Sequence, residues 1–366
     1  MPAAMMNLLR KCGNGFLWLN LWHSGLLSKL KAAGVAGAAF QWFTNFLSNR
    51  VQATAVDGSV SLFSSLHDGV PQGAILSPLL FSVYMNDIPL ADSTNLFADD
   101  TSLYAVAPSP SKLGECLQDK TDTICSWFCK WLLTVNSAKS AVMVFRSRKM
   151  QPVDINITVD SSPIKQVTVH RHLGVLFNEF FTWSNHVTNI ISKASAKVGF
   201  LRRLGKRIDS LVVWDLYLCC IRPAVEYACV VLAGLSATDC HRLERLNRSA
   251  ARLIAQVSPS EDLSHDLILA RAGILTLHQR HQAAQSKFCH HALAGRLPPH
   301  LQTALMNWLP PPPSHGMTQR ETASSIHLPR PRKSLFRNSP LYCAFSTWNS
   351  LPSSLRNSPT LASLTS

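Results

Sequence analysis

The chain has 366 residues with a hydrophobic share of 46%, enough for two or more folded domains and too apolar for a disordered tail. Its formal net charge of +14 predicts a polyanionic partner, either a nucleic acid or an anionic membrane surface. Composition alone does not choose between these two partners. No run of about eighteen apolar residues occurs, so we expect no transmembrane helix.

The ten cysteines are scattered, without a C-x-x-C pair or a spacing typical of zinc sites. Cys125 and Cys129 lie one helical turn apart in an apolar stripe and are interpreted as core thiols. The N-terminal segment, with Arg10-Lys11 followed by the apolar residues 16–19, weakly resembles a signal peptide. No small-residue cleavage site follows it, so we do not interpret it as one. We therefore expect a reducing compartment and a protein that is not secreted.

The first predicted elements are two helices and a hairpin. Ser24 is expected to cap a helix through residues 25–31 that ends at Gly34, and a second helix follows over residues 36–48. Asp57-Gly58 is the strongest short turn signal in the chain and predicts a hairpin of residues 51–56 and 60–66.

A loop and a helix are predicted next. Gly73 gives the loop a backbone that can approach a ligand closely, and Pro78 suits the first helical position. An ordinary loop-to-helix connection explains the same residues. The buried side of the helix is predicted to consist of Leu79, Leu80, Val83 and Ile88.

Two adjacent carboxylates, Asp99 and Asp100, separate two apolar-rich runs. We expect a hairpin of two short strands with both carboxylates at its bend, where they can reach one pocket. Turn preference alone would explain an isolated Asp pair, so the neighbouring motifs must decide its meaning.

The second half of the chain reads as mainly helical. An amphipathic core helix is predicted over residues 112–133, and strands over residues 142–145 and 168–177. A basic helix with its following turn covers residues 186–207, for which a merely solvated face is the alternative. Further elements are helices over residues 211–229 and 239–254, a stiff proline run at 310–313 and a tail from residue 330.

Four segments, in this order and at this spacing, resemble the central and later motifs of the reverse transcriptases of non-LTR (LINE-type) retrotransposons. They are Gly69 to Phe81 running on to residues 84–89, Asn95 to Tyr104 with the Asp99-Asp100 pair, residues 131–140, and His172 to Phe177 with Leu173-Gly174. The resemblance covers residues 27–351 and is densest over residues 70–177.

The resemblance implies an α+β fold: a partial right-hand polymerase palm, which is an antiparallel sheet with helices, followed by an α-helical thumb and C-terminal region. The implied divisions are a remnant of fingers and palm with a replaced N-terminus (residues 1–60), the palm (61–182), the thumb (183–260), C-terminal helices (261–309) and a proline-rich linker and tail (310–366).

The resemblance also implies the site. Asp99 and Asp100 would be catalytic and hold Mg²⁺ or Mn²⁺, and Lys139 would lie near the departing pyrophosphate unless it is only an exposed turn lysine. The nucleotide and template would be bordered by Gln72, Gly73, Phe97 and Ala98, and the primer gripped by Leu173 and Gly174. The nucleic-acid backbone would be contacted by Lys193, Lys197, Arg202, Arg203, Lys206 and Arg207. The implied partners are an RNA template, a DNA primer and a dNTP, with no membrane, and the expected localisation is a nuclear or cytoplasmic ribonucleoprotein.

The sequence departs from the family at the first palm motif. Family members carry a catalytic Asp in the region that here reads Gly13 to Asn20, and no Asp or Glu precedes Asp57. We expect the strand facing the Asp pair to be lost, and the chain to be an N-terminally truncated relative that does not polymerise. Three hypotheses follow: an active reverse transcriptase, a catalytically dead remnant that binds nucleic acid through its basic thumb, or a reading frame without a stable fold.

Overall fold

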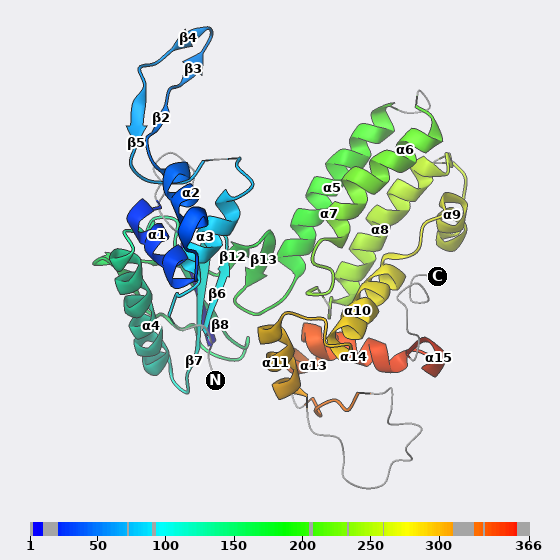
Figure 1. The fold of residues 1–366 in the computed structure, drawn as a ribbon. Coiled ribbons are helices and arrows are strands. Elements are labelled where there is room, and N and C mark those ends of the chain that lie inside the picture. Colours follow the sequence, from blue (N-terminus) through cyan, green and yellow to red (C-terminus); the bar gives the residue numbers. More distant parts are fainter. Residues whose placement is uncertain are drawn as a thin grey trace. The chain divides into compact units, whose positions relative to one another are not determined.

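The computed structural model describes residues 3–9, 21–71, 73–89, 93–204, 208–232, 234–258, 260–309, 326–331 and 334–356. The chain divides into two compact units (Figure 1): unit 1 comprises Met1–His170 and Asn178–Phe180, and unit 2 comprises Arg171–Phe177 and Phe181–Ser366. Helices and small antiparallel sheets together confirm the predicted α+β class. None of the described helices combines the length and apolar character needed to cross a bilayer.

Unit 1 is built on a five-stranded sheet in the order β11-β8-β1-β7-β6. All neighbouring strands run antiparallel except β11, which pairs parallel with β8. The strands are β1 (Ala3–Leu9), β6 (Thr94–Phe97), β7 (Asp100–Val106), β8 (Ala141–Phe145) and β11 (Lys165–Gln166). The strands predicted around the Asp pair and at residues 142–145 are therefore confirmed.

Strand β1 lies at the centre of this sheet, between β7 and β8. It corrects the expectation that the strand facing the Asp pair is lost. Its sequence, AAMMNLL, is rich in helix-favouring Ala and Met, so pairing with two neighbours, not local propensity, makes it a strand. The region from Gly13 to Asn20, which was matched to the family motif, lies outside the described residues.

Four helices lie in the described part of unit 1: α1 (His23–Ala32), α2 (Gly37–Leu47), α3 (Ser77–Met85) and α4 (Pro110–Lys130). Each coincides with a predicted helix. The predicted Ser24 cap is wrong, because α1 begins at His23 and Trp22 occupies its N-cap without a side-chain hydrogen bond. In α3, Leu80 is buried, but the prediction for Leu79 is wrong, since that side chain is 59% exposed.

Between α2 and α3 the chain forms the predicted hairpin. β2 (Arg50–Gln52) pairs with β5 (Ser64–Leu66), and β3 (Ala55–Val56) with β4 (Ser59–Val60). Asp57 and Gly58 both have positive φ, +47° and +80°, as a two-residue hairpin turn requires. The ribbon extends away from the rest of unit 1 (Figure 1).

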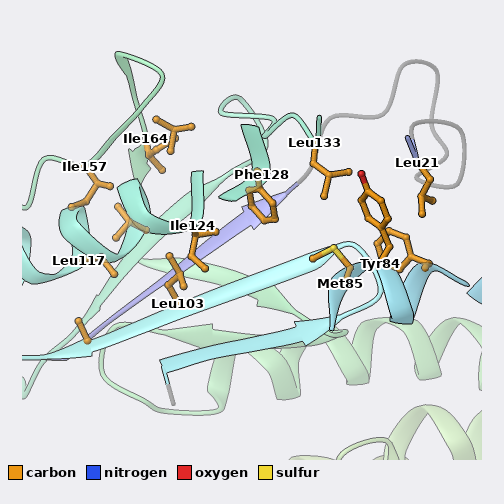
Figure 2. Packing of buried hydrophobic residues seen from close by; sticks show 14 of the residues in the cluster. Leu21, Tyr84, Met85, Leu103, Leu117, Ile124, Phe128, Leu133, Ile157 and Ile164 are labelled. Atoms are coloured by element: carbon orange, nitrogen blue, oxygen red, sulfur yellow. The ribbon is translucent and has the colours of Figure 1, made fainter. Parts of the chain in front are cut away.

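Helix α4 packs its apolar stripe onto the sheet, as predicted. Figure 2 shows Leu117, Ile124 and Phe128 of this helix over Leu103 of β7. Leu103 is fully buried, whereas Tyr104 beside it on the opposite face is 43% exposed. Strand β7 therefore buries one face in the core and leaves the other partly open.

Two of the three cysteines of α4, Cys125 and Cys129, differ in their surroundings. Cys125 is half-buried, and burial raises the pKa of its thiol to about 12. Cys129 is exposed, so its prediction as a core thiol is wrong.

A buried lysine ties α1 to α3 and α4. Lys29 is 8% exposed, its ammonium donates to the Tyr84 carbonyl oxygen at 2.5 Å, and it pairs with Asp87. The ammonium also lies 3.6 Å from the ring centroid of Trp131 and 4.5 Å from that of Trp127. Burial lowers the pKa of Lys29, while Asp87 raises it and the aromatic faces attract the charged form.

Unit 2 is mostly helical. Its described helices are α5 (Ser184–Leu204), α6 (Ser210–Leu216), the π-helix η5 (Tyr217–Ile221), α7 (Arg222–Glu226), α8 (Ala237–Ile254), α9 (His265–Ala272), α10 (Leu277–Leu293), α11 (Pro299–Trp308), α13 (Ser334–Arg337), α14 (Pro340–Ser350) and α15 (Ser353–Arg356). The helices predicted over residues 186–207, 211–229 and 239–254 correspond to α5, to α6 with η5 and α7, and to α8.

The segment over residues 168–177, predicted as one strand, forms a hairpin. β12 (Val169–His172) and β13 (Val175–Asn178) pair around a two-residue turn at Leu173-Gly174. Both turn residues have positive φ, +45° and +84°, which a continuous strand cannot contain.

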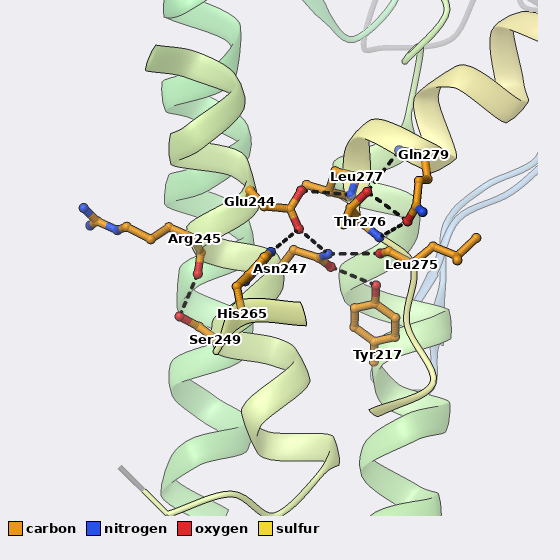
Figure 3. A network of polar contacts seen from close by, with 10 residues as sticks. All are labelled: Tyr217, Glu244, Arg245, Asn247, Ser249, His265, Leu275, Thr276, Leu277 and Gln279. Atoms are coloured by element: carbon orange, nitrogen blue, oxygen red, sulfur yellow. Dashed lines mark hydrogen bonds and ion pairs between the residues drawn. The ribbon is translucent and has the colours of Figure 1, made fainter. Parts of the chain in front are cut away.

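Glu244 of α8 joins the starts of α9 and α10 (Figure 3). Its Oε1 accepts from Asn247 Nδ2 at 3.0 Å and lies 3.1 Å from His265 Nε2, while its Oε2 accepts from the Leu277 backbone amide at 2.9 Å. Tyr217 extends the network by donating to Asn247 Oδ1 at 3.2 Å. One carboxylate thus fixes three helices of unit 2 to one another.

The C-terminal helix α14 packs against α10. Phe345 and Trp348 are 0% and 2% exposed and cluster with Cys289 and Ala292. Helix α14 is therefore part of the folded helical unit. The proline run at residues 310–313 lies outside the described residues.

Candidate active site and nucleic-acid interface

Asp99 lies in the turn of the β6–β7 hairpin, as predicted, whereas Asp100 is the first residue of strand β7. Phe97 pairs with Asp100, so Ala98 and Asp99 form a two-residue turn. Both aspartates are half-buried, and Phe97 is 63% exposed. Ala98 has a φ of +49°, a left-handed conformation that costs a residue with a Cβ about 1–2 kcal/mol. Backbone strain of this kind is typical of functional turns.

The strand beside this hairpin offers no carboxylate. Leu9 pairs with Asp100 and Leu8 with Thr101, and β1 contains no acidic residue. In the part of the chain that the structure describes, no group of three or more His, Cys, Asp or Glu is arranged to hold a metal ion. Two neighbouring carboxylates suit one Mg²⁺ that keeps water or phosphate oxygens as its other ligands. They do not suit a metal pair about 3.5–4 Å apart, which needs more negative charge around it.

Lys139 precedes β8 at the same end of the sheet as Asp100. β8 pairs with β1 from Ala141 and Asn7 onward, and Leu9, two residues beyond the end of that pairing, is the partner of Asp100 in β7. Lys139 is exposed, and its backbone amide donates to the Asn136 carbonyl at 3.1 Å in a turn.

The loop before α3 holds Gly73 in a left-handed conformation with a φ of +82°. No atom lies within 4 Å of the position that a Cβ would take, so backbone conformation, not crowding, requires glycine here. Ser77 Oγ donates to the Pro71 carbonyl at 2.5 Å and fixes the loop to α3. Gln72 lies outside the described residues.

The Leu173-Gly174 turn is supported by Tyr227, which follows α7. Tyr227 Oη donates to the Leu173 carbonyl oxygen at 2.6 Å. A Cβ at Gly174 would come within 3.1 Å of the Tyr227 ring. No sequence pattern points to Tyr227, because it lies 54 positions from Leu173.

The cations of α5 that were predicted to contact a nucleic-acid backbone differ in their surroundings. The described ones, Lys193, Lys197, Arg202 and Arg203, are exposed, whereas Lys206 and Arg207 lie outside the described residues. Lys197 donates to the Cys220 carbonyl of η5 at 2.7 Å. Arg202 instead lines a groove between α5 and α8.

Helix α8 carries cations that the sequence interpretation did not include, Arg242, Arg245, Arg248 and Arg252. Arg248 donates to the Leu263 carbonyl at 3.0 Å, and Arg252 to the Ser258 carbonyl at 2.7 Å, so both hold the segment after α8. Their spacing of three or four residues is the sequence signal that places them along one side of a helix.

A family model described as reverse transcriptase (RNA-dependent DNA polymerase) matches residues 15–177. The match includes the Gly73 loop, the Asp hairpin, Lys139 and the Leu173-Gly174 turn. The class that this sheet and hairpin define is therefore the reverse transcriptase domain.

Individual relatives indicate which kind of reverse transcriptase the chain is similar to. The "Probable RNA-directed DNA polymerase from transposon X-element" of Drosophila melanogaster is 26% identical over 244 residues, covering 64% of this chain and 26% of that protein. The RNA-directed DNA polymerase from mobile element jockey of Drosophila funebris is 24% identical over 269 residues, 69% of this chain and 29% of that protein. A retrovirus-related Pol polyprotein from type-1 retrotransposable element R1 2 of Nasonia vitripennis is 28% identical over 148 residues, 38% and 36%.

Residues 15–177 therefore carry a reverse transcriptase domain, and the chain is similar to the RNA-directed DNA polymerases of non-LTR (LINE-type) retrotransposons. It spans between 26% and 36% of the length of these three relatives.

Proposed function

We propose that this chain binds an RNA template paired with a DNA primer and presents the Asp99-Asp100 hairpin to the primer end and an incoming dNTP. The observation that carries the proposal is the pair of half-buried carboxylates at the strained turn that ends the β6–β7 hairpin. The open backbone at Gly73 and the net charge of +14 favour an anionic ligand over other partners.

Asp99 and Asp100 are the residues that would hold Mg²⁺ or Mn²⁺ in this proposal. The bound ion would neutralise triphosphate oxygens. Lys139, at the same end of the sheet, supplies a further positive charge near the departing pyrophosphate.

We further propose that the 366-residue chain copies RNA very poorly. In β1 the residue in register with Asp100 is Leu9, so the strand next to the hairpin contributes no charge to a second ion. Loss of one preorganised electrostatic group costs about 10²–10³ in rate. Binding of nucleic acid, which uses other residues, should survive.

Primer extension on an RNA template with Mg²⁺ or Mn²⁺ tests the catalytic half, with Asp99→Asn as the matched inactive control. We expect wild type and Asp99→Asn to be indistinguishable. Robust extension by wild type that Asp99→Asn abolishes would contradict the proposed incompetence and establish an active polymerase.

Binding of a fluorescent RNA–DNA hybrid tests the second part of the proposal, that the chain binds nucleic acid. We expect binding that weakens steeply between about 50 and 200 mM salt, as phosphate contacts release counterions. A chain that folds but does not bind the hybrid at the lower salt would refute the proposed function.

A further inference from the structure

The ribbon formed by β2 to β5 has one apolar face and one mainly polar face. Val51 pairs with Ser65 and Ala55 with Val60, and paired residues of an antiparallel ribbon lie on the same face. Every second residue of a strand returns to that face, which places Leu62 beside Val60. The opposite face carries Gln52, Thr54, Ser59, Ser61 and Ser64, with Val56 near the turn and Leu66 at the base.

A β-bulge adds to the exposure of the apolar face. Between two points of pairing, residues 52–54 of one strand face residues 61–64 of the other, which is one residue more. The bulge lies at Leu62 and Phe63, whose side chains are 92% and 74% exposed, and the two valines of the apolar face are more than half exposed as well. Removing such side chains from water is favourable, so this face is suited to contact another apolar surface.

The ribbon lacks the positive charge that dominates the chain. Residues 51–66 contain one charged residue, Asp57 in the turn, and no Lys or Arg, whereas the whole chain has a formal net charge of +14. Nucleic acids and anionic lipids are attracted to cations, so the composition of the ribbon favours neither of them. The surface that fits this face is uncharged and apolar.

We propose that this apolar face binds the same face of a second copy of the chain, with the two ribbons antiparallel about a two-fold axis. An uncharged apolar face is complementary to itself, and a two-fold interface brings identical surfaces together. In this arrangement the Asp57 turn of one copy meets the end of the other ribbon that begins at Arg50, so the charges at the two ends are complementary too. The inference does not depend on the proposed binding of nucleic acid.

The available area predicts a weak dimer. Covering Val51, Val60, Leu62 and Phe63 in both copies would bury roughly 1,000 Å² in total, near the lower limit for a specific interface. The ribbon extends away from the rest of unit 1 (Figure 1), which leaves its apolar face open to a second ribbon. We therefore expect a dimer that dissociates in the micromolar range.

Sedimentation equilibrium of the full chain, after nuclease treatment and in high salt, tests the proposal. High salt weakens bridging by residual nucleic acid but not contacts between apolar side chains. The average mass of wild type should rise with concentration toward that of two copies. Leu62→Arg places an unpaired charge in the contact and should raise the dissociation constant of the dimer about 10-fold or more.

Ser64→Arg is the matched control. Ser64 is exposed and pairs with Gln52 on the polar face, so the same charge is added to the same ribbon outside the contact. Its dissociation constant should stay close to that of wild type. Both variants replace exposed side chains and should keep the melting temperature of wild type, which shows that folding is not the cause of a difference.

A cross-link tests the antiparallel arrangement. Leu62 lies midway between the base and the turn of the ribbon, so its two copies should meet near the two-fold axis. Leu62→Cys should therefore form a disulfide-linked dimer under mild oxidation in higher yield than Ser64→Cys, which carries the same native cysteines. Equal yields would contradict the arrangement.

Two other results would overturn the proposal. One is a wild type that stays monomeric at all concentrations, and the other is an equal dissociation constant in Leu62→Arg and Ser64→Arg. If a monomeric wild type instead sediments with phosphatidylcholine vesicles, and Leu62→Arg loses this binding while Ser64→Arg keeps it, the face binds a lipid surface and not a second copy.

Discussion

The hydroxyl of Tyr227 donates a hydrogen bond to the carbonyl oxygen of Leu173, and the same ring lies against Gly174. The segment after α7 thereby fixes the conformation of the β12–β13 turn. The resemblance implies that this turn approaches the primer end, so we expect its shape to affect nucleic-acid binding as well as stability.

Tyr227→Phe should destabilise unit 2 by about 0.5–1 kcal/mol, because it removes one partly exposed hydrogen bond and keeps the ring. Urea unfolding measures the loss, and hydrogen exchange over residues 169–178 should quicken. Leu173→Ala is the control, since the accepting group is a backbone carbonyl and the bond is retained. Unchanged exchange in Tyr227→Phe would show that the bond does not hold the turn.

Gly174→Ala should cost more than Tyr227→Phe, about 2 kcal/mol or above. The added Cβ meets a backbone φ of +84° and a ring atom at 3.1 Å. In a Tyr227→Ala background the steric part disappears and only the backbone part remains. A double-mutant cycle on urea midpoints measures this coupling, and strictly additive effects would contradict the contact.

The buried ring of His186 predicts that the stability of unit 2 depends on pH. The ring is 3% exposed, and its Nδ1 accepts from the Leu176 amide at 3.3 Å, which requires an unprotonated Nδ1. Burial lowers the pKa of His186 below 6.5, with smaller contributions from Arg171 and Lys193. Between the lowered folded-state pKa and pH 6.5, His186 is protonated more often in the unfolded chain than in the folded chain. The contribution of His186 to the free energy of unfolding is therefore fully present above pH 6.5 and is lost as the pH falls through this range.

The measurement is the free energy of unfolding at about pH 7.5, 6.5 and 5.5. Wild type should lose up to about 1.4 kcal/mol per pH unit more than His186→Asn, which accepts the same amide without titrating. His278→Asn, at an exposed position, should keep the wild-type slope. Equal slopes in wild type and His186→Asn would remove His186 as the cause.

Lys29→Met separates packing from charge in unit 1. Asp87 is 54% exposed and regains water when its partner is removed, so Lys29→Met should change stability by only about 1 kcal/mol. Lys29→Ala also removes the buried stem and should cost about 2–4 kcal/mol. Thermal unfolding compares them, and an equal loss in both variants would show that the ammonium, not the stem, stabilises the site.

Leu9→Asp should give the Asp hairpin a third carboxylate. We expect Mg²⁺ to raise the melting temperature of this variant by more than that of wild type, because a ligand that binds only the folded state stabilises it. Asn7→Asp is the matched control: Asn7 is in register with Ser102, about 7 Å farther along the strand. The same Mg²⁺ response in both variants would contradict a specific site at Leu9.

Local patterns predicted most elements of unit 1. The apolar stripe of α4, the Asp57-Gly58 turn and the Asp hairpin each depend on residues close in sequence, and the structure contains all three. Strand β1 did not follow from its residues, because only its two neighbours impose the extended conformation. The β12–β13 hairpin was missed because Leu-Gly is a weak turn signal beside Asn-Gly or Asp-Gly.

The candidate site likewise combines residues that sequence motifs predicted with contacts that only the folded structure shows. Asp99, Asp100 and Gly73 were found from motifs, and the structure shows the strained turn and open backbone at these positions. The support of Gly174 by Tyr227 and the convergence of Arg202 with Arg245 join residues far apart in the chain. Such contacts depend on tertiary packing, which periodicity within one element does not report.

Helix α14 closes the interior of the helical unit with Phe345 and Trp348. A premature stop codon before Pro340 would therefore remove two aromatic side chains from the hydrophobic core of unit 2. The Cys289 thiol, now fully buried, would become open to alkylating reagents. We therefore expect a chain that ends before Pro340 to be less stable than the full chain.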